Sequence, residues 1–199
     1  MGCLKNIFRA VILTLAVVGF LSLGGKEFVG GLINNYFNPS KDVMLERAKK
    51  VGDFSHINDE FEIEKAAGIM GYNAVVAEHK ASGQKMFVVD AGDKPILTAD
   101  DIKSNNVEEK LQKALSKVKY QSISVDELRV TKHGTMHSYG KDVPYVKFEA
   151  KIKKLPIGDV GGIVSVADMN DEGRRLLISL NEKNKYSQLI SEEFFRKIK

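Results

Sequence analysis

The apolar stretch from Ile7 to Gly25 constrains this chain more than any other feature. Between Ala10 and Leu23 only Thr14 and Ser22 are polar, and both hydroxyls can bond to the helix carbonyl one turn earlier. In a helix, at roughly 1.5 Å per residue, the stretch is about 28 Å long. This length is close to the ~30 Å hydrocarbon core of a bilayer. The sequence therefore predicts a transmembrane helix over residues 7–25.

Two interpretations of this stretch remain open. In the first it is an uncleaved signal anchor. In the second it is a signal peptide that is cleaved after Gly24, with Ser22 and Gly24 as the small residues of the cleavage site. The juxtamembrane segment, residues 26–40, favours the anchor because its apolar residues recur every four positions and extend a helical stripe beyond the span. That stripe consists of Phe28, Val29, Leu32, Ile33, Tyr36 and Phe37.

The charges that flank the apolar stretch predict its orientation. Lys5 and Arg9 lie at its N-terminal end, whereas Lys26 on the far side is balanced by Glu27. The positive-inside rule therefore places residues 1–6 in the cytoplasm and the C-terminal domain outside it, in a single-pass topology. Near the N-terminus, Cys3 is interpreted as an incidental reduced cysteine, with palmitoylation as the alternative.

Composition limits the class of the remaining chain. Outside the first 37 residues there are 27 basic and 25 acidic side chains, which alternate along the sequence. Nucleic-acid binders gather positive charge on one face, so no nucleic-acid partner is expected. The single cysteine excludes an intrachain disulfide, and the chain has no N-glycosylation sequon because Asn38-Pro39-Ser40 carries proline in the middle. These two facts favour a bacterial envelope protein.

The apolar spacing predicts an α+β fold for residues 41–199, a mostly antiparallel sheet with packed helices. Capping boxes are expected at residues 98–101 and 106–109. Helices are expected over 41–51, with Gly52 as C-cap, over 107–118, and on the stripe Tyr186, Leu189, Ile190, Phe194 and Ile198. Strands are expected over 61–64 and 72–79, and 66–71 is ambiguous between strand and helix, with strand favoured. Further strands are expected over 85–90, from Leu128, and over 145–153, 163–167 and 175–180, with a polar turn region at 133–142.

This order of elements resembles that of the Mog1/PsbP-like α+β group, which includes membrane-associated and extracytoplasmic members. The resemblance covers the soluble part of the chain and concerns the order of helices and strands. It implies that fold for residues 41–199, and no site residue is carried over from it.

Several short patterns resemble sites but lack a required part. His133 and His137 are four residues apart, yet no HExxH motif supplies further zinc ligands. Residues 168–173 begin like a calcium loop, but the twelfth position is Ser179 rather than glutamate. Glu78 and His79 are neighbours on an expected strand, so their side chains point to opposite faces. No catalytic, cofactor-binding or metal-binding residue is therefore assigned.

The sequence predicts a membrane-anchored extracytoplasmic domain that binds a protein or lipid partner at the cell envelope without catalysis or a cofactor. The alternative is a secreted protein with a cleaved signal, whose hydrolase-type or lipid-carrying site forms only in the fold. The enzyme alternative requires one pocket that holds at least two of five residues, and lipid carriage requires a large apolar cavity. The five residues are His79, Asp90, His133, His137 and Asp168.

Overall fold

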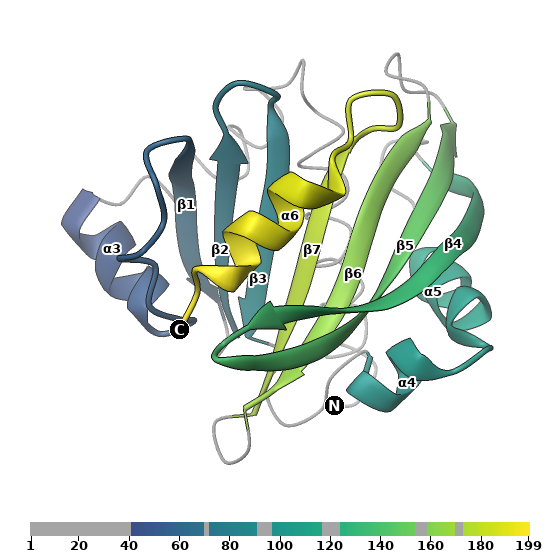
Figure 1. Ribbon diagram of the computed structural model, residues 1–199, viewed down its shortest axis with the longest axis horizontal. Helices are drawn as coiled ribbons and strands as arrows, with labels where there is room; N and C mark the ends of the chain where they lie inside the picture. Colours follow the sequence, from purple (N-terminus) through teal and green to yellow (C-terminus); the bar gives the residue numbers. More distant parts are fainter. Residues whose placement is uncertain (1–40, 70–71, 91–96, 117–123, 154–158, 170–172) are drawn as a thin grey trace.

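The computed structural model describes residues 41–69, 72–90, 97–116, 124–153, 159–169 and 173–199. These residues form a seven-stranded sheet with helices on both faces (Figure 1). The strands are β1 (Phe61–Ile69), β2 (Tyr72–His79), β3 (Gln84–Asp90), β4 (Ser124–Ser138), β5 (Lys141–Lys153), β6 (Val160–Asp168) and β7 (Arg174–Glu182). The helices are α3 (Lys41–Lys49), α4 (Ala99–Lys103), α5 (Val107–Ser116) and α6 (Gln188–Arg196).

Every neighbouring pair of strands is antiparallel, and the strand order is β1-β2-β3-β7-β6-β5-β4. The sheet therefore consists of two meanders, β1-β2-β3 and β4-β5-β6-β7, which join where β3 pairs with β7. The α+β class and the mostly antiparallel sheet predicted from the sequence are confirmed. The predicted transmembrane segment and the segment 26–40 lie outside the described residues, among which no helix is long and apolar enough to cross a membrane.

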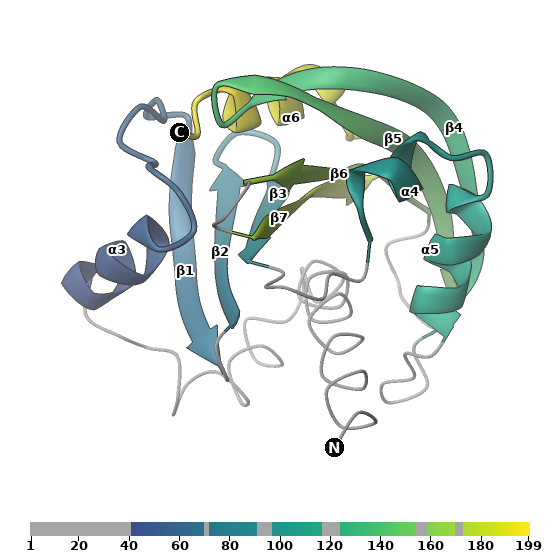
Figure 2. The same cartoon turned by 90° about the horizontal axis from the view of Figure 1, so that it is seen from below.

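The sheet is strongly curved, with α6 on one side and α4 and α5 on the other (Figure 2). Alternate residues of each strand face opposite sides, so the sheet supports two apolar clusters. One cluster packs beneath α3 and α6 and includes Val88, Leu177 and Phe194. The other packs against α4 and α5 and includes Phe148 and Ile178. The strand β3 is covered on both faces, as its run of four apolar residues predicts.

Buried polar side chains fix α6 on the sheet. Gln84, which is fully buried, donates from Nε2 to Ser179 Oγ at 3.0 Å, to Ser191 Oγ at 2.9 Å and to the Ser187 carbonyl at 2.9 Å. Its Oε1 accepts the Ser187 N–H at 2.9 Å. The predicted C-terminal helix is confirmed and lies across the sheet (Figure 1), but Leu189 is 76% exposed and does not strengthen the packed stripe.

The prediction of a polar turn over residues 133–142 is wrong. The turn contains only Tyr139 and Gly140, at φ angles of 52° and 70°, while β4 continues to Ser138 and β5 begins at Lys141. Two consecutive positive φ values are typical of a two-residue hairpin turn. The residues before the turn are polar because β4 is an edge strand whose side chains reach solvent, so their polarity does not indicate a loop.

Two expected caps differ from the sequence prediction. The capping box at Thr98 is confirmed, with reciprocal bonds between Thr98 and Asp101. At the second expected box, the Asn106 side-chain oxygen instead accepts a hydrogen bond from the Ser104 hydroxyl, at 2.6 Å. Gly52 follows α3 without a positive φ. A Cβ there would lie 2.8 Å from Ile198 Cγ2, so glycine permits the chain end to pack closely and does not serve as a left-handed cap.

Candidate functional site

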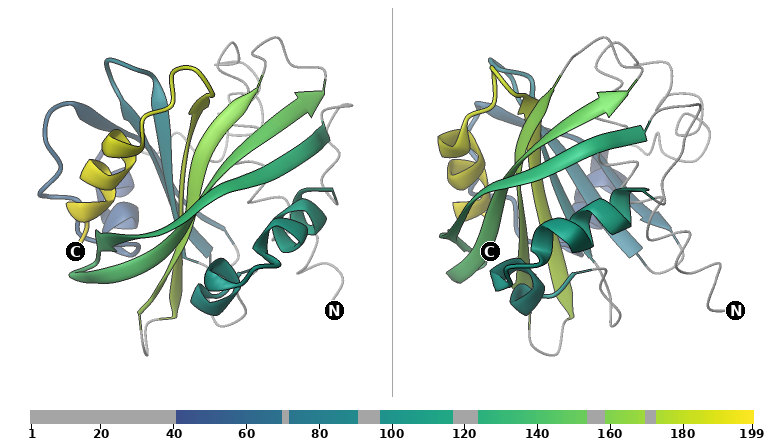
Figure 3. Two further views of the ribbon diagram at one scale, coloured as in Figure 1. Left: turned by 45° about the vertical axis from the view of Figure 1, so that its right-hand side comes forward. Right: turned by 90° about the vertical axis from the view of Figure 1, so that its right-hand side faces the viewer.

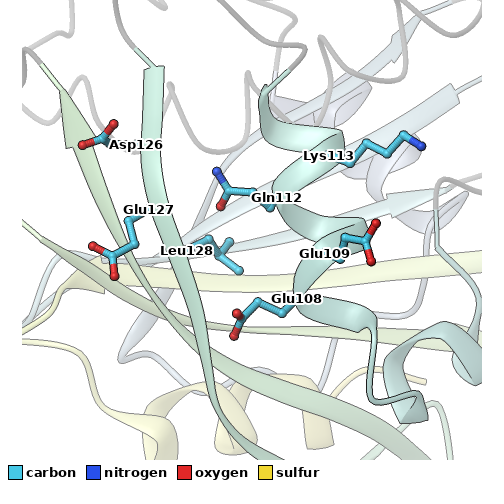
Figure 4. Close-up of a pocket in the computed structure, with 7 residues that line it drawn as sticks. All are labelled: Glu108, Glu109, Gln112, Lys113, Asp126, Glu127 and Leu128. Atoms are coloured by element: carbon cyan, nitrogen blue, oxygen red, sulfur yellow. The ribbon is translucent and has the colours of Figure 1, made fainter.

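A depression between α5 and β4, here called the α5–β4 groove, is the candidate functional site. Its volume is about 660 Å³, and it is open to solvent. Figure 4 shows that Glu108 and Gln112 point from α5 toward β4, with Leu128 between the two elements. The lining residues are Glu108, Glu109, Gln112, Lys113, Asp126, Glu127 and Leu128.

The amphipathic pattern of α5 positions the helical side of the groove. Val107 and Leu111 are buried against the sheet, so the residues beside them on the helix surface, Glu108 and Gln112, face the flank next to β4. On the opposite wall, β4 has a register irregularity between Val125 and Glu127. Such irregularities bend a strand and redirect its side chains, and this one lies at the rim of the groove.

The groove is acidic. Its lining contains four carboxylates and one lysine, a formal net charge of −3. Glu127 Oε2 lies 2.8 Å from Lys151 Nζ, and the hydrogen bond from Lys151 lowers the pKa of Glu127. Glu108 Oε2 accepts the backbone N–H of Val130 at 2.6 Å. Carboxylates of this kind attract cationic groups such as the ends of lysine and arginine side chains.

A buried acceptor without a donor lies within this acidic lining. Gln112 Oε1 is inaccessible to solvent and has no hydrogen-bond partner among the described residues. An unpaired buried carbonyl oxygen costs about 1–3 kcal/mol. Because this oxygen is closed off from solvent, a partner N–H can reach it only if the Gln112 amide rotates toward the open groove, and that contact would recover part of the cost.

The polar groups of the lining are four carboxylates, one amide and one ammonium group. The seven lining residues include no serine, cysteine or histidine that could act as a nucleophile or as a neutral base. Across the described ranges as a whole, no group of three or more His, Cys, Asp and Glu side chains is placed to hold a metal ion. The groove therefore offers charge and acceptor atoms.

The five residues that the enzyme alternative requires do not line this groove. His133 and His137 lie on β4 with exposed side chains. Asp90 pairs with Arg175 at 3.0 Å at the end of β3, and Asp168 pairs with Arg174 at 2.5 Å at the end of β6. Asp90 and Asp168 thus lie at the same end of the sheet, on strands that flank β7, and each carboxylate serves an ion pair with a β7 arginine.

His79 is the last residue of β2 and lies beside the β2–β3 turn, where it pairs with Gln84 at the start of β3. Asp90 is at the other end of β3. Its Nδ1 is 2.8 Å from Ser82 Oγ and also accepts the Ser82 N–H at 3.3 Å, so the ring stabilises the turn. The ring packs on Phe61, with centroids 5.2 Å apart, whereas Glu78 turns to Lys85 on the other face. The two neighbours therefore point in opposite directions, as their strand position predicts.

The calcium-loop pattern is only partly described. Asp168 directs its carboxylate to Arg174 Nε at 2.5 Å, and Met169 N donates to the Gly173 carbonyl at 2.7 Å in a hairpin turn. Asn170 and Glu172 lie outside the described residues, as does Cys3. In the described part of this turn, the first carboxylate of the pattern serves an ion pair.

A second charged cluster lies on the α4/α5 side of the sheet at β1, β2 and β3. Lys85 is only 8% exposed and pairs with Glu64 at 2.8 Å and also with Glu78. Burial raises the pKa of Glu64, and this effect outweighs the opposing hydrogen bond from Lys85. The cluster neutralises a nearly buried lysine, which is a structural role.

Sequence reasoning missed the α5–β4 groove. Glu108 and Glu109 were assigned to a helix start, and no pattern linked them to Asp126 and Glu127, which are about one helix and one connection further along the chain. The available signal was the occurrence of two adjacent acidic pairs at the start of a helix and of a strand. Their convergence depends on how α5 packs on β4.

The fold and the groove together define a class, an antiparallel α+β domain with an acidic surface groove. Comparison of the chain with protein-family models finds no match, and comparison with curated proteins finds no similar sequence.

Proposed function

We propose that this chain is a membrane-anchored domain outside the cytoplasm that binds a basic segment of a partner protein at the bacterial cell envelope, without catalysis. The observation that carries the proposal is the buried Gln112 Oε1, which lacks a donor inside an acidic groove. Lysine and arginine side chains supply both positive charge and N–H donors. A basic segment would therefore complement the groove in charge and in hydrogen bonding.

The apolar stretch of residues 7–25 supports the anchored part of the proposal. Its length suits a bilayer core, and the charges around it favour a cytoplasmic N-terminus. The helix α3 begins at Lys41, sixteen residues after the end of this stretch. The folded domain would therefore be held close to the non-cytoplasmic face of the membrane. An anchored domain needs only modest affinity, because tethering raises the effective concentration of both partners.

Binding of an eight-residue oligolysine to the full-length chain in detergent tests the groove. Gln112→Leu removes the unpaired oxygen, so it should stabilise the fold while weakening oligolysine binding about 5-fold, the value of roughly one hydrogen bond. Glu109→Lys should weaken binding further, and Glu46→Lys on α3, an exposed site with the same charge change, is its matched control. Equal losses in the Glu109 and Glu46 variants would remove the groove from the proposal.

Alkaline carbonate extraction of membranes tests the anchor. The full-length chain should stay in the membrane pellet, and protease added outside intact cells should digest the domain. Release into the supernatant would favour the cleaved, secreted alternative, and protection from external protease would overturn the orientation.

A further inference from the structure

The β4–β5 hairpin determines which backbone groups of β4 face outward. Tyr139 and Gly140 form a two-residue turn, in which the carbonyl before the turn accepts the N–H after it, so Ser138 and Lys141 are a hydrogen-bonded pair. In an antiparallel ladder, hydrogen-bonded pairs alternate with pairs whose N–H and C=O groups point away from the partner strand. The register from Lys132 to Ser138 is regular. The outward positions are therefore His133, Thr135 and His137.

The donors on either side of this stretch are satisfied by the chain itself. The Val130 N–H bonds to Glu108 Oε2 at 2.6 Å, and the Tyr139 N–H bonds to the Ile198 carbonyl at 3.0 Å. Between them, within the described ranges, the outward backbone groups of residues 133, 135 and 137 have no partner. Their three side chains are exposed, and β4 is the last strand of the sheet (Figure 3).

This open edge is self-complementary. In the segment His133-Gly134-Thr135-Met136-His137, the outward residues are His, Thr and His, and this order is the same in either chain direction. If a second copy approached antiparallel with Thr135 on the two-fold axis, Thr135 would face Thr135 and His133 would face His137. Each outward residue would exchange two backbone bonds, which makes six in total. Lys132 would lie opposite Ser138, so no two lysines would be directly opposed.

We propose that two copies of this chain pair through the outer edge of β4 between residues 133 and 137, and so form one continuous sheet across a two-fold axis. Isologous pairing of this kind is the commonest symmetry of homo-oligomers. The opposite edge is less suited to pairing because β1 has a register irregularity between Ile63 and Lys65.

The pairing depends on the proposed membrane anchor for its strength. A five-residue edge buries much less than the roughly 1,200 Å² of a stable protein interface, so the free chains should associate weakly. Anchoring confines the copies to one surface with their domains at a common height, which raises their effective concentration. The expected dimer is therefore a property of the membrane-bound chain.

Disulfide trapping in native membranes tests the register. Cys3 is the sole cysteine, so a Cys3→Ser background carries no other thiol. In that background Thr135→Cys should give a covalent dimer when a copper oxidant is added, because residues on the axis lie about 5.5 Å apart at Cα. His133→Cys alone and His137→Cys alone should not cross-link, since each lies about 13 Å from its own copy. Co-expressed, the two should form the mixed dimer.

Each outcome bears on the proposal. Absence of a Thr135→Cys dimer from chains that remain in the membrane pellet would overturn the edge pairing and leave the anchor intact. Release of the chains from membranes with the cross-link preserved would overturn the anchor and leave the pairing intact. Equal cross-linking by His133→Cys alone would show random collision, and a Thr135→Cys adduct with a different polypeptide would show that the edge binds another protein; either result overturns self-pairing. Thr135→Pro, which removes the outward N–H, should abolish the dimer while far-ultraviolet circular dichroism reports an unchanged fold.

Discussion

Arg175 and Asp90 form an ion pair across β7 and β3, with Arg175 Nη1 3.0 Å from Asp90 Oδ1. Arg175 is only 5% exposed, and its Nε also donates to the Val51 carbonyl at 3.1 Å. The same carbonyl accepts the Tyr139 hydroxyl at 2.7 Å, and burial raises the pKa of Tyr139, which keeps that donor protonated. The pair thus ties the junction of the two meanders to the segment after α3 and to the β4–β5 turn.

Arg175→Met should destabilise the protein by about 3 kcal/mol, because it leaves the largely buried Asp90 without this cation. Urea unfolding followed by circular dichroism measures the change. The double variant Asp90→Asn with Arg175→Met should lose less stability than Arg175→Met alone, because the carboxylate charge at position 90 is then removed together with the arginine. A double variant that lost the sum of both single effects would contradict this account.

Glu64→Gln should change the pH dependence of stability. Burial raises the pKa of Glu64 in the folded state, so the folded state binds the proton more tightly than the unfolded chain does. The stabilisation is present below the ordinary glutamate pKa and is lost as the pH rises through the raised pKa of the folded state. Thermal unfolding between pH 4 and pH 8 should show a flatter profile for Glu64→Gln and a higher midpoint near neutral pH.

Glu78→Gln is the matched comparison for that variant. Glu78 pairs with the same Lys85, and its carboxylate makes the closer contact with Lys85 Nζ, so Glu78 is the main partner of this nearly buried ammonium group. Its loss should therefore lower the unfolding midpoint at neutral pH. If the two glutamine variants behaved alike, the distinct desolvation of Glu64 would not be the cause.

Gly162→Ala should destabilise the fold by about 1–3 kcal/mol, the usual range for overpacking. A Cβ at this position would collide with the Ser179 carbonyl oxygen on β7, which is backbone and cannot move aside cheaply. Gly161→Ala is the neighbouring control, because its nearest atom, Tyr186 Cβ, is 3.3 Å away. Equal midpoints in urea for the two variants would contradict the assigned close approach of β6 and β7.

Gln84→Leu should loosen α6 from the sheet. The substitution removes the amide that bonds Ser179, Ser187 and Ser191 and leaves buried hydroxyls with fewer partners, at a cost of about 2–4 kcal/mol. Hydrogen exchange should accelerate most in α6 and much less in α5, which packs on the other face. Uniform acceleration throughout the domain would mean that α6 does not open as a separate unit.

The sequence alone predicted most of the local structure. Alternation along residues 145–153 identified β5 because every second side chain there faces the core, and the four-residue spacing from Tyr186 to Ile198 identified α6 for the corresponding helical reason. The Thr98 capping box was also predictable, since its hydrogen bonds join residues three apart. The length of β4 was not predictable, because an exposed edge strand and a polar loop have the same composition.

The amino-acid sequence by itself determined the apolar stretch of residues 7–25, the α+β class and the positions of most helices and strands, since those features depend on residues close together in the chain. Only the tertiary structure decided that β7 lies beside β3, that Glu108 and Gln112 face β4, and that His133, Thr135 and His137 form an open edge. These relationships join residues far apart in the chain. They arise from the packing of two meanders into one sheet, which no local spacing encodes.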